Sequence, residues 1–268
     1  MGDLITTLQD MRHLNWSESY QTSGTSGTFL KANEGAGTGR VYYKLSCYDN
    51  YRGIFGHECV NELVASRLLG LMGIEHVGYK LIHALVEVDG KGYETWVSAS
   101  SSYRHSTERK QAMDVFFRFN RQEGETPLDM CDRLGWGLHI RQMMLADYLI
   151  ANRDRHGANI EVLRGEDGLQ RLAPFFDNGL SFVFSCYKDE EKALKFDVMQ
   201  DMPTNNYIGT KSLFENLAFL KGWDLKVEAV QDAWRSELFE GLDGVISAAH
   251  QEAMWNMISK RWRHYEAL

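Results

Sequence analysis

The chain has 268 residues, a formal net charge of −8 and an apolar fraction of 44%. Its length suits one compact domain or two closely joined lobes, and its acidic balance argues against nucleic-acid binding through phosphate neutralisation. No apolar run approaches the roughly 18 residues that span a bilayer, and the N-terminus lacks the pattern of a secretory signal, so we expect a cytoplasmic protein that contacts neither membrane nor nucleic acid.

A glycine-rich region lies near the N-terminus. Residues 23–28 repeat Ser-Gly-Thr twice, and a second glycine-rich turn at residues 34–40 leads into the β-favouring run at residues 41–45. Glycine lets backbone N–H groups approach phosphate oxygens closely, and hydroxyl side chains add further donors. A flexible hairpin tip has the same composition, and the Walker-type phosphate loop is not matched. The candidate nucleotide contacts in this region are Ser26, Gly27 and Thr28.

A lysine stands inside the β-favouring run, where a lysine would normally face solvent. In kinases, a strand lysine at this place contacts the α- and β-phosphates of ATP and pairs with a glutamate on a helix. Residues 58–72 carry apolar side chains at helical spacing and are expected to form that helix. Lys44 is therefore a candidate phosphate ligand, with Glu62 or Glu58 as its partner.

Two further strands follow. Tyr79–Val88 and residues 93–99 read as strands joined by Asp89-Gly90, a strong hairpin signal. In a kinase, the second strand would run into the hinge between two lobes, and adenine would meet the backbone near residues 97–100. Val97 and Ser98 are therefore candidate nucleotide contacts, although a surface loop explains the serine-rich run equally well.

The central part of the chain reads as helices followed by a polar loop. Residues 108–120 and 127–151 are helical in pattern, and the second stretch ends in a buried segment. A polar loop at residues 151–159 comes next. Two short apolar strands, at residues 160–163 and 172–176, then lead to Asp177.

Three oxygen-bearing residues stand at the spacing that phosphoryl transfer from Mg-ATP requires. Asp154 could accept a proton from an attacking hydroxyl, and Asn159 and Asp177 could hold Mg²⁺, which prefers hard oxygen ligands. Taken singly, the Asp-Arg-His triplet is more often a charged loop and Asp-Asn-Gly a surface turn. The joint order of helix, polar loop, hairpin and Asp favours a kinase core.

Two motifs give the chain a resemblance to a known family. They are Asn152-x-Asp154-Arg155-His156-x-x-Asn159 and Phe176-Asp177-x-Gly179. The combination resembles the HipA-like serine/threonine kinases of bacteria and, more distantly, the phosphatidylinositol kinases, whereas ordinary protein kinases have His-Arg-Asp here. The resemblance, from about residue 20 onward, implies an α+β, bilobal protein-kinase-like fold. It implies an N-lobe at residues 1–100, with an antiparallel sheet, one main helix and the glycine-rich loop. A mostly helical C-lobe at residues 101–268 would hold the catalytic loop.

The resemblance also bears on single residues. It selects Glu62 over Glu58 as the partner of Lys44, and it makes Lys31 a lysine of the glycine-rich loop. His156 would donate to the transferring phosphate, although a structural role in the loop is an equal alternative. Some members phosphorylate a serine of their own glycine-rich loop, and the candidates here are Ser23, Thr25, Ser26 and Thr28. Only about twenty residues precede that loop, so we expect a stand-alone kinase core that lacks the extra N-terminal subdomain of the HipA toxins.

The C-terminal third completes the expected C-lobe. Residues 182–210 stand where an activation segment would, and residues 212–220, 224–239 and 243–265 are expected to be helical. The sequence thus predicts an ATP- and Mg²⁺-dependent serine/threonine protein kinase, monomeric or weakly oligomeric, that acts on a protein hydroxyl. The alternatives are a lipid or small-molecule kinase on the same fold, and a nucleotide-binding pseudokinase or regulatory module.

Overall fold

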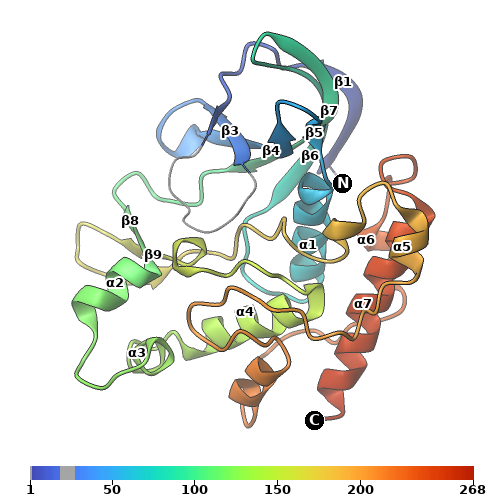
Figure 1. Ribbon diagram of the computed structural model, residues 1–268. Helices are drawn as coiled ribbons and strands as arrows, with labels where there is room; N and C mark the ends of the chain where they lie inside the picture. Colours follow the sequence, from blue (N-terminus) through green and yellow to red (C-terminus); the bar gives the residue numbers. More distant parts are fainter. Residues whose placement is uncertain (1, 19–27) are drawn as a thin grey trace.

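The computed structural model describes residues 2–18 and 28–268 (Figure 1). A mainly antiparallel sheet has the strand order β1-β6-β7-β4-β3-β2, and β5 pairs with β4. Its strands are β1 (Leu4–Asp10), β2 (Ser17–Glu18), β3 (Thr28–Glu34), β4 (Val41–Asp49), β5 (Gly53–Phe55), β6 (Tyr79–Val88) and β7 (Lys91–Ser101). We call this sheet with helix α1 the N-lobe and the residues from 102 onward the C-lobe. The expected α+β fold class is confirmed.

Helix α1 (Glu58–Leu71) lies between the sheet and the rest of the chain (Figure 1). Its expected bounds are confirmed to within one residue, and Gly73 follows it in the left-handed region, at φ 71°. Leu63, Val64 and Leu68 are at most 1% exposed and belong to the core that α1 shares with the C-lobe. Burial on nearly every side fixes the helix, and with it the side chains that it directs toward the site.

The β6–β7 hairpin is confirmed, and its turn has the conformation that its sequence predicts. Asp89 and Gly90 both have positive φ, at 52° and 74°, as a tight two-residue hairpin turn requires. The edge strand β1 was not predicted, because its sequence is largely polar and most of its residues are exposed. It pairs with β6 in parallel, a long-range contact that local sequence does not encode.

The C-lobe is built mainly from helices, and a small sheet lies beside α2 (Figure 1). The helices are α2 (Met113–Asn120), α3 (Pro127–Arg133), α4 (Gly137–Ile150), α5 (Glu190–Leu194), α6 (Trp234–Leu238) and α7 (Ala248–Glu266). The small sheet has the order β10-β9-β8, with β8 (Arg109–Ala112), β9 (Glu161–Arg164) and β10 (Gln170–Leu172). Figure 1 shows α4 and α7 in the lower half of the molecule, away from the N-lobe sheet.

Two expected helices were wrong in part. The stretch 108–120 is a helix only from Met113, because Arg109–Ala112 pairs with β9 as strand β8. The stretch 127–151 is two helices, because Gly135 adopts φ 78° between α3 and α4. The first error arose because strand pairing with a distant segment overrides helical periodicity.

The strand and helices expected further along were also displaced. The strand at 172–176 is β10, which ends at Leu172, so an irregular segment leads to Asp177. Of the stretch 224–239 only Trp234–Leu238 is helical, and residues 215–220 form a 3₁₀ helix. Helix α7 begins at Ala248 rather than at residue 243, because the Ser247 side chain caps it by accepting from the His250 N–H. No helix in the described part of the chain is long and apolar enough to cross a membrane.

Candidate active site

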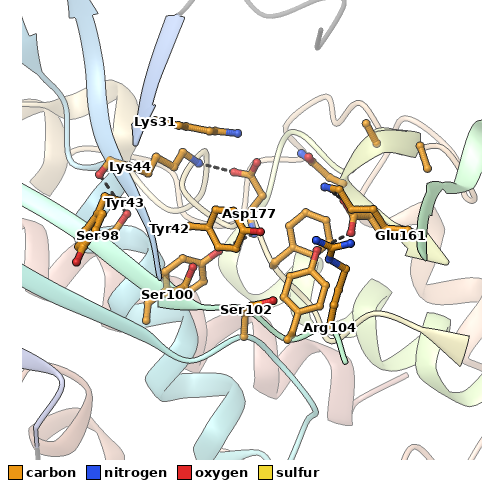
Figure 2. A pocket seen from close by; sticks show the side chains of 18 residues that line it. Lys31, Tyr42, Tyr43, Lys44, Ser98, Ser100, Ser102, Arg104, Glu161 and Asp177 are labelled. Atoms are coloured by element: carbon orange, nitrogen blue, oxygen red, sulfur yellow. Dashed lines mark hydrogen bonds and ion pairs between the residues drawn. The ribbon is translucent and has the colours of Figure 1, made fainter. Parts of the chain in front are cut away.

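A cavity of about 500 Å³ lies between the N-lobe sheet and the paired strands β8 and β9 of the C-lobe (Figure 2). Such a volume suits a small ligand of nucleotide size. The lining residues are Lys31, Tyr42, Tyr43, Lys44, Val77, Tyr79, Ser98, Ser100, Ser102, Tyr103, Arg104, Lys110, Ala112, Ala158, Asn159, Glu161, Phe176 and Asp177. The cavity therefore brings together segments from both lobes.

Lys44 is the positive centre of this cavity. Its ammonium donates to Asp177 Oδ1 at 2.5 Å and to Glu62 Oε1 at 3.2 Å, and its side chain is only 12% exposed. Burial alone would lower the pKa of Lys44, but the carboxylates of Asp177 and Glu62 outweigh burial and raise that pKa well above its usual value. Figure 2 shows the lysine directed toward Asp177. Lys44 is therefore a fixed cation.

Glu62 connects α1 to both the lysine and the turn that follows Asp177. One carboxylate oxygen accepts from Lys44, and the other accepts from the Asn178 N–H at 2.8 Å. Glu58, the alternative partner, is turned away and accepts instead from Cys47 Sγ at 3.3 Å. The helix thus holds the strand lysine and the turn after Asp177 in one arrangement.

Asp177 has a strained backbone and an ionised side chain. Its φ of 58° lies in the left-handed region, which non-glycine residues adopt at a cost and which occurs often at functional sites. The backbone N–H donates to the Tyr79 hydroxyl at 3.3 Å. Burial would raise the pKa of Asp177, but Lys44 and Lys31 outweigh it and hold that pKa well below its usual range. The carboxylate is therefore anionic and fit to ligate a cation.

The polar loop after α4 carries Asp154, which is not among the cavity-lining residues, whereas Ala158 and Asn159 of the same loop are. Asn152 Oδ1 accepts from the Asp154 N–H at 3.1 Å, and the Asp154 carbonyl accepts from Asn159 Nδ2 at 2.8 Å. The carboxylate of Asp154 accepts a hydrogen bond from Asn205 Nδ2 at 3.3 Å, and His156 Nε2 lies 3.7 Å from its other oxygen, Oδ2. The loop therefore fixes the backbone of the candidate base, whereas Asn205 contacts its carboxylate from outside the loop.

His156 also has a visible structural role. Its Nδ1 accepts from the Ala158 N–H at 3.1 Å and so caps the short 3₁₀ helix at Gly157–Asn159. This leaves Nε2 as the nitrogen directed toward Asp154. In this orientation His156 can cap the 3₁₀ helix through Nδ1 and keep Nε2 as a donor, so the structural role and the donor role do not exclude each other.

Of the remaining candidate nucleotide contacts, some line the cavity and others do not. Lys31 and Ser98 line the cavity, whereas Val97 lies in the hydrophobic core of the N-lobe sheet, because neighbouring strand residues face opposite sides. Ser26 and Gly27 lie outside the described residues. Thr28 begins β3, but its side chain is not among those described.

A charged cluster at the far end of the cavity escaped the sequence reasoning. Glu161 Oε2 accepts from the Tyr103 hydroxyl at 2.5 Å, and Oε1 accepts from Lys110 Nζ at 2.8 Å. The Tyr103 ring stacks on Phe176, with ring centroids 5.7 Å apart. The chain leaves the N-lobe sheet at the end of β7, and Tyr103 lies two residues beyond that end, where it lines the cavity. The available signal was a glutamate in an apolar strand two residues after Asn159.

The side-chain oxygens of Asp177 and Asn159 fit a hydrated Mg²⁺. Asp177 supplies a carboxylate and Asn159 an amide oxygen, and both residues line the same cavity. The Asn159 amide nitrogen is bound to the Asp154 carbonyl, so its oxygen points away from that carbonyl. Two protein oxygens with several waters and phosphates are the usual surroundings of Mg²⁺.

Known structures share this fold. No protein-family model and no curated protein matches the sequence. The structure of the proinflammatory kinase CtkA of Helicobacter pylori matches 97% of this chain and 98% of its own, with a TM-score of 0.62 and 15% identity. The chain has the fold of this kinase. HipA in the Shewanella oneidensis HipA–HipB–operator DNA complex matches 94% of this chain and 59% of its own, with a TM-score of 0.42 and 13% identity. The kinase fold that the motifs predict is therefore confirmed.

Proposed function

We propose that the protein transfers the γ-phosphoryl group of ATP, bound with Mg²⁺, to a serine or threonine hydroxyl of a protein. One observation carries the proposal. Lys44 meets the carboxylates of both Glu62 and Asp177 inside a nucleotide-sized cavity, and Asn159 lines that cavity. Buried charges are costly, and a cavity in which several of them converge is a candidate functional site.

Each residue then has a role that its contacts support. Lys44 would bind phosphate oxygens while Glu62 holds it in place. Asn159 and Asp177 would hold Mg²⁺, which, when bound, offsets the negative charge on the transferred group. Asp154 would orient the acceptor hydroxyl and take its proton. The buried hydrogen bonds around Asp154 hold its backbone in one place, which favours transfer by positioning.

The acceptor is the less constrained half of the proposal. The family resemblance favours a protein hydroxyl, including hydroxyls of the chain's own glycine-rich loop. Ser23, Thr25, Ser26 and Thr28 are the candidates for self-modification. The acidic net charge of −8 gives no reason to expect an anionic membrane surface as the site of action.

The test is the intact mass of the purified protein after incubation with Mg-ATP. Wild type is compared with Asp154→Ala and Asp177→Ala, and Asp232→Ala serves as control because its carboxylate is 86% exposed and belongs only to a 3.7 Å surface pair. We expect a phosphate gain in wild type and in the control alone, and peptide mapping then locates it.

Absence of any mass gain directs the test to added acceptors. Myelin basic protein supplies serine and threonine hydroxyls, and titration with Mg-ATP measures nucleotide affinity. No transfer to the chain itself or to myelin basic protein, together with no ATP binding, would refute the proposed function. Tight ATP binding without any transfer would instead support the regulatory module.

A further inference from the structure

Residues 204–207 of the C-lobe lie directly along the polar loop at residues 151–159, which carries Asp154. The Asn205 N–H donates to the Arg153 carbonyl at 2.8 Å, and the Tyr207 N–H donates to the Arg155 carbonyl at 3.0 Å. Thr204 Oγ1 adds a bond to the Asn152 carbonyl at 3.0 Å. These three hydrogen bonds hold the two segments side by side, although about fifty positions separate them in sequence.

This segment is anchored on both sides of Asn205. Thr204 is 3% exposed and Ile208 is 6% exposed. Between them, Asn206 Oδ1 accepts from the N–H groups of both Ile208 and Gly209 at 2.9 Å, which closes a tight turn. Asn205 thus has an exposed side chain on a backbone that its neighbours hold in place.

The amide of Asn205 reaches the candidate base itself. Nδ2 lies 3.3 Å from Asp154 Oδ1, within hydrogen-bonding distance, while His156 approaches the other oxygen, Oδ2, at 3.7 Å. The backbone around Asp154 is fixed by Asn152 and Asn159, but those bonds do not hold its carboxylate. Asn205 is therefore the group that sets the direction of the carboxylate from outside the loop.

We propose that Asn205 is a positioning residue for Asp154. The inference rests on the proposed function. In the transfer step, the acceptor oxygen forms a bond to the γ-phosphorus, the bond from that phosphorus to the ADP oxygen breaks, and the hydroxyl proton passes to Asp154. Asn205 gains and loses no proton. It holds one carboxylate oxygen so that the other faces the hydroxyl.

The role predicts a specific kinetic pattern. A donor that orients the base should affect turnover, whereas the nucleotide binds in the cavity that Lys44, Asn159 and Asp177 line, which does not include Asn205. A misplacement of about 1 Å at a reacting group can reduce rate by about 100-fold. Removal of the amide should therefore reduce kcat by about 10- to 100-fold and leave the KM for ATP within about twofold of wild type.

The experiment uses the full chain with Mg-ATP and myelin basic protein as the acceptor. Asn205→Leu removes the donor at nearly constant size, and Asn205→Gln keeps an amide on a longer arm. Asn50→Leu, on the exposed β4–β5 turn, is the matched control. We expect a large loss of kcat in Asn205→Leu, recovery to within about fivefold of wild type in Asn205→Gln, and no loss in the control.

The outcomes separate the inference from the function on which it rests. An inactive wild type that also fails to modify itself would reject the proposed function. An active wild type with unchanged kcat in Asn205→Leu, or with equal loss in the Leu and Gln variants, would overturn the positioning role. If Asn205→Leu does not fold, as judged by circular dichroism, Asn205→Asp takes its place. Its carboxylate would repel that of Asp154, and an unchanged kcat there would equally overturn the proposal.

Discussion

The guanidinium of Arg155 and the carboxylate of Asp147 form an ion pair buried beneath the loop that carries Asp154. Both residues are 1% exposed, and their closest atoms lie 2.8 Å apart. Arg155 also donates to the carbonyls of Asn159 and Phe176. One side chain therefore connects the end of α4, the catalytic loop and the segment before Asp177, which explains why an arginine follows the candidate base.

Removal of one partner of this pair should destabilise the whole fold. Asp147→Ala leaves the Arg155 charge buried without its counter-ion, and such changes typically cost about 3–5 kcal/mol. Urea unfolding of the variant measures the loss. Lys195→Ala, which breaks the exposed pair with Glu191 on α5, is the control and should change the free energy of unfolding by less than about 1 kcal/mol. Equal effects of the two variants would contradict the bracing role.

Replacement of Lys44 should strongly reduce turnover and should leave the N-lobe folded. Lys44→Met deletes the cation that joins Glu62 to Asp177, and loss of one preorganised electrostatic group typically reduces kcat by about 10²–10³. Steady-state kinetics measure the loss. Lys80→Met on the exposed face of β6 is the matched strand control and should retain wild-type turnover. A Lys44→Met enzyme with full turnover would exclude Lys44 from the mechanism.

A methyl group at Gly157 should displace the catalytic loop. A Cβ there would lie 2.6 Å from Asp114 Cβ and 3.0 Å from the Asp114 backbone nitrogen, at the start of α2. Overpacking of this kind costs about 1–3 kcal/mol, so Gly157→Ala should lower both thermal stability and turnover. Gly92→Ala is the control, because its Cβ would meet no heavy atom of the described chain within 4 Å. Unaltered stability and turnover in Gly157→Ala would show that the loop can move freely.

Stability should fall in mild acid because of two partly buried histidines. Burial lowers the pKa of His139 and of His57 to about 4. The unfolded chain binds a proton near pH 6.5, so between about pH 6.5 and 4 it holds more protons than the folded chain. Stability is therefore complete above this range and is lost as the pH falls through it.

The measurement is the free energy of unfolding in urea at several pH values between 4.5 and 7. Each of the two histidines contributes at most about 1.4 kcal/mol per pH unit. His139→Leu should flatten the dependence, and addition of His57→Leu should flatten it further. An identical slope in wild type and in the double variant would show that other groups govern the acid response.

The candidate site residues that belong to a local sequence motif could be predicted from the sequence. The loop from Asn152 to Asn159, the strand lysine and the helix glutamate are recognisable because each needs a particular residue type at a fixed spacing from its neighbours. The β6–β7 hairpin was predictable for a similar reason, since Asp89-Gly90 by itself favours the positive φ values that the turn adopts. Helix α1 followed from its apolar spacing.

The sequence by itself determined the fold class, the order of these elements and the residue types of the candidate site. Only the tertiary structure decided which distant groups meet. Strand β8 replaced a predicted helical turn because β9 was there to pair with it. Glu161 reached the cavity and Val97 the core because of strand register, and Asn205 met Asp154 across about fifty residues. Long-range pairing and packing settle such contacts, and local propensity does not encode them.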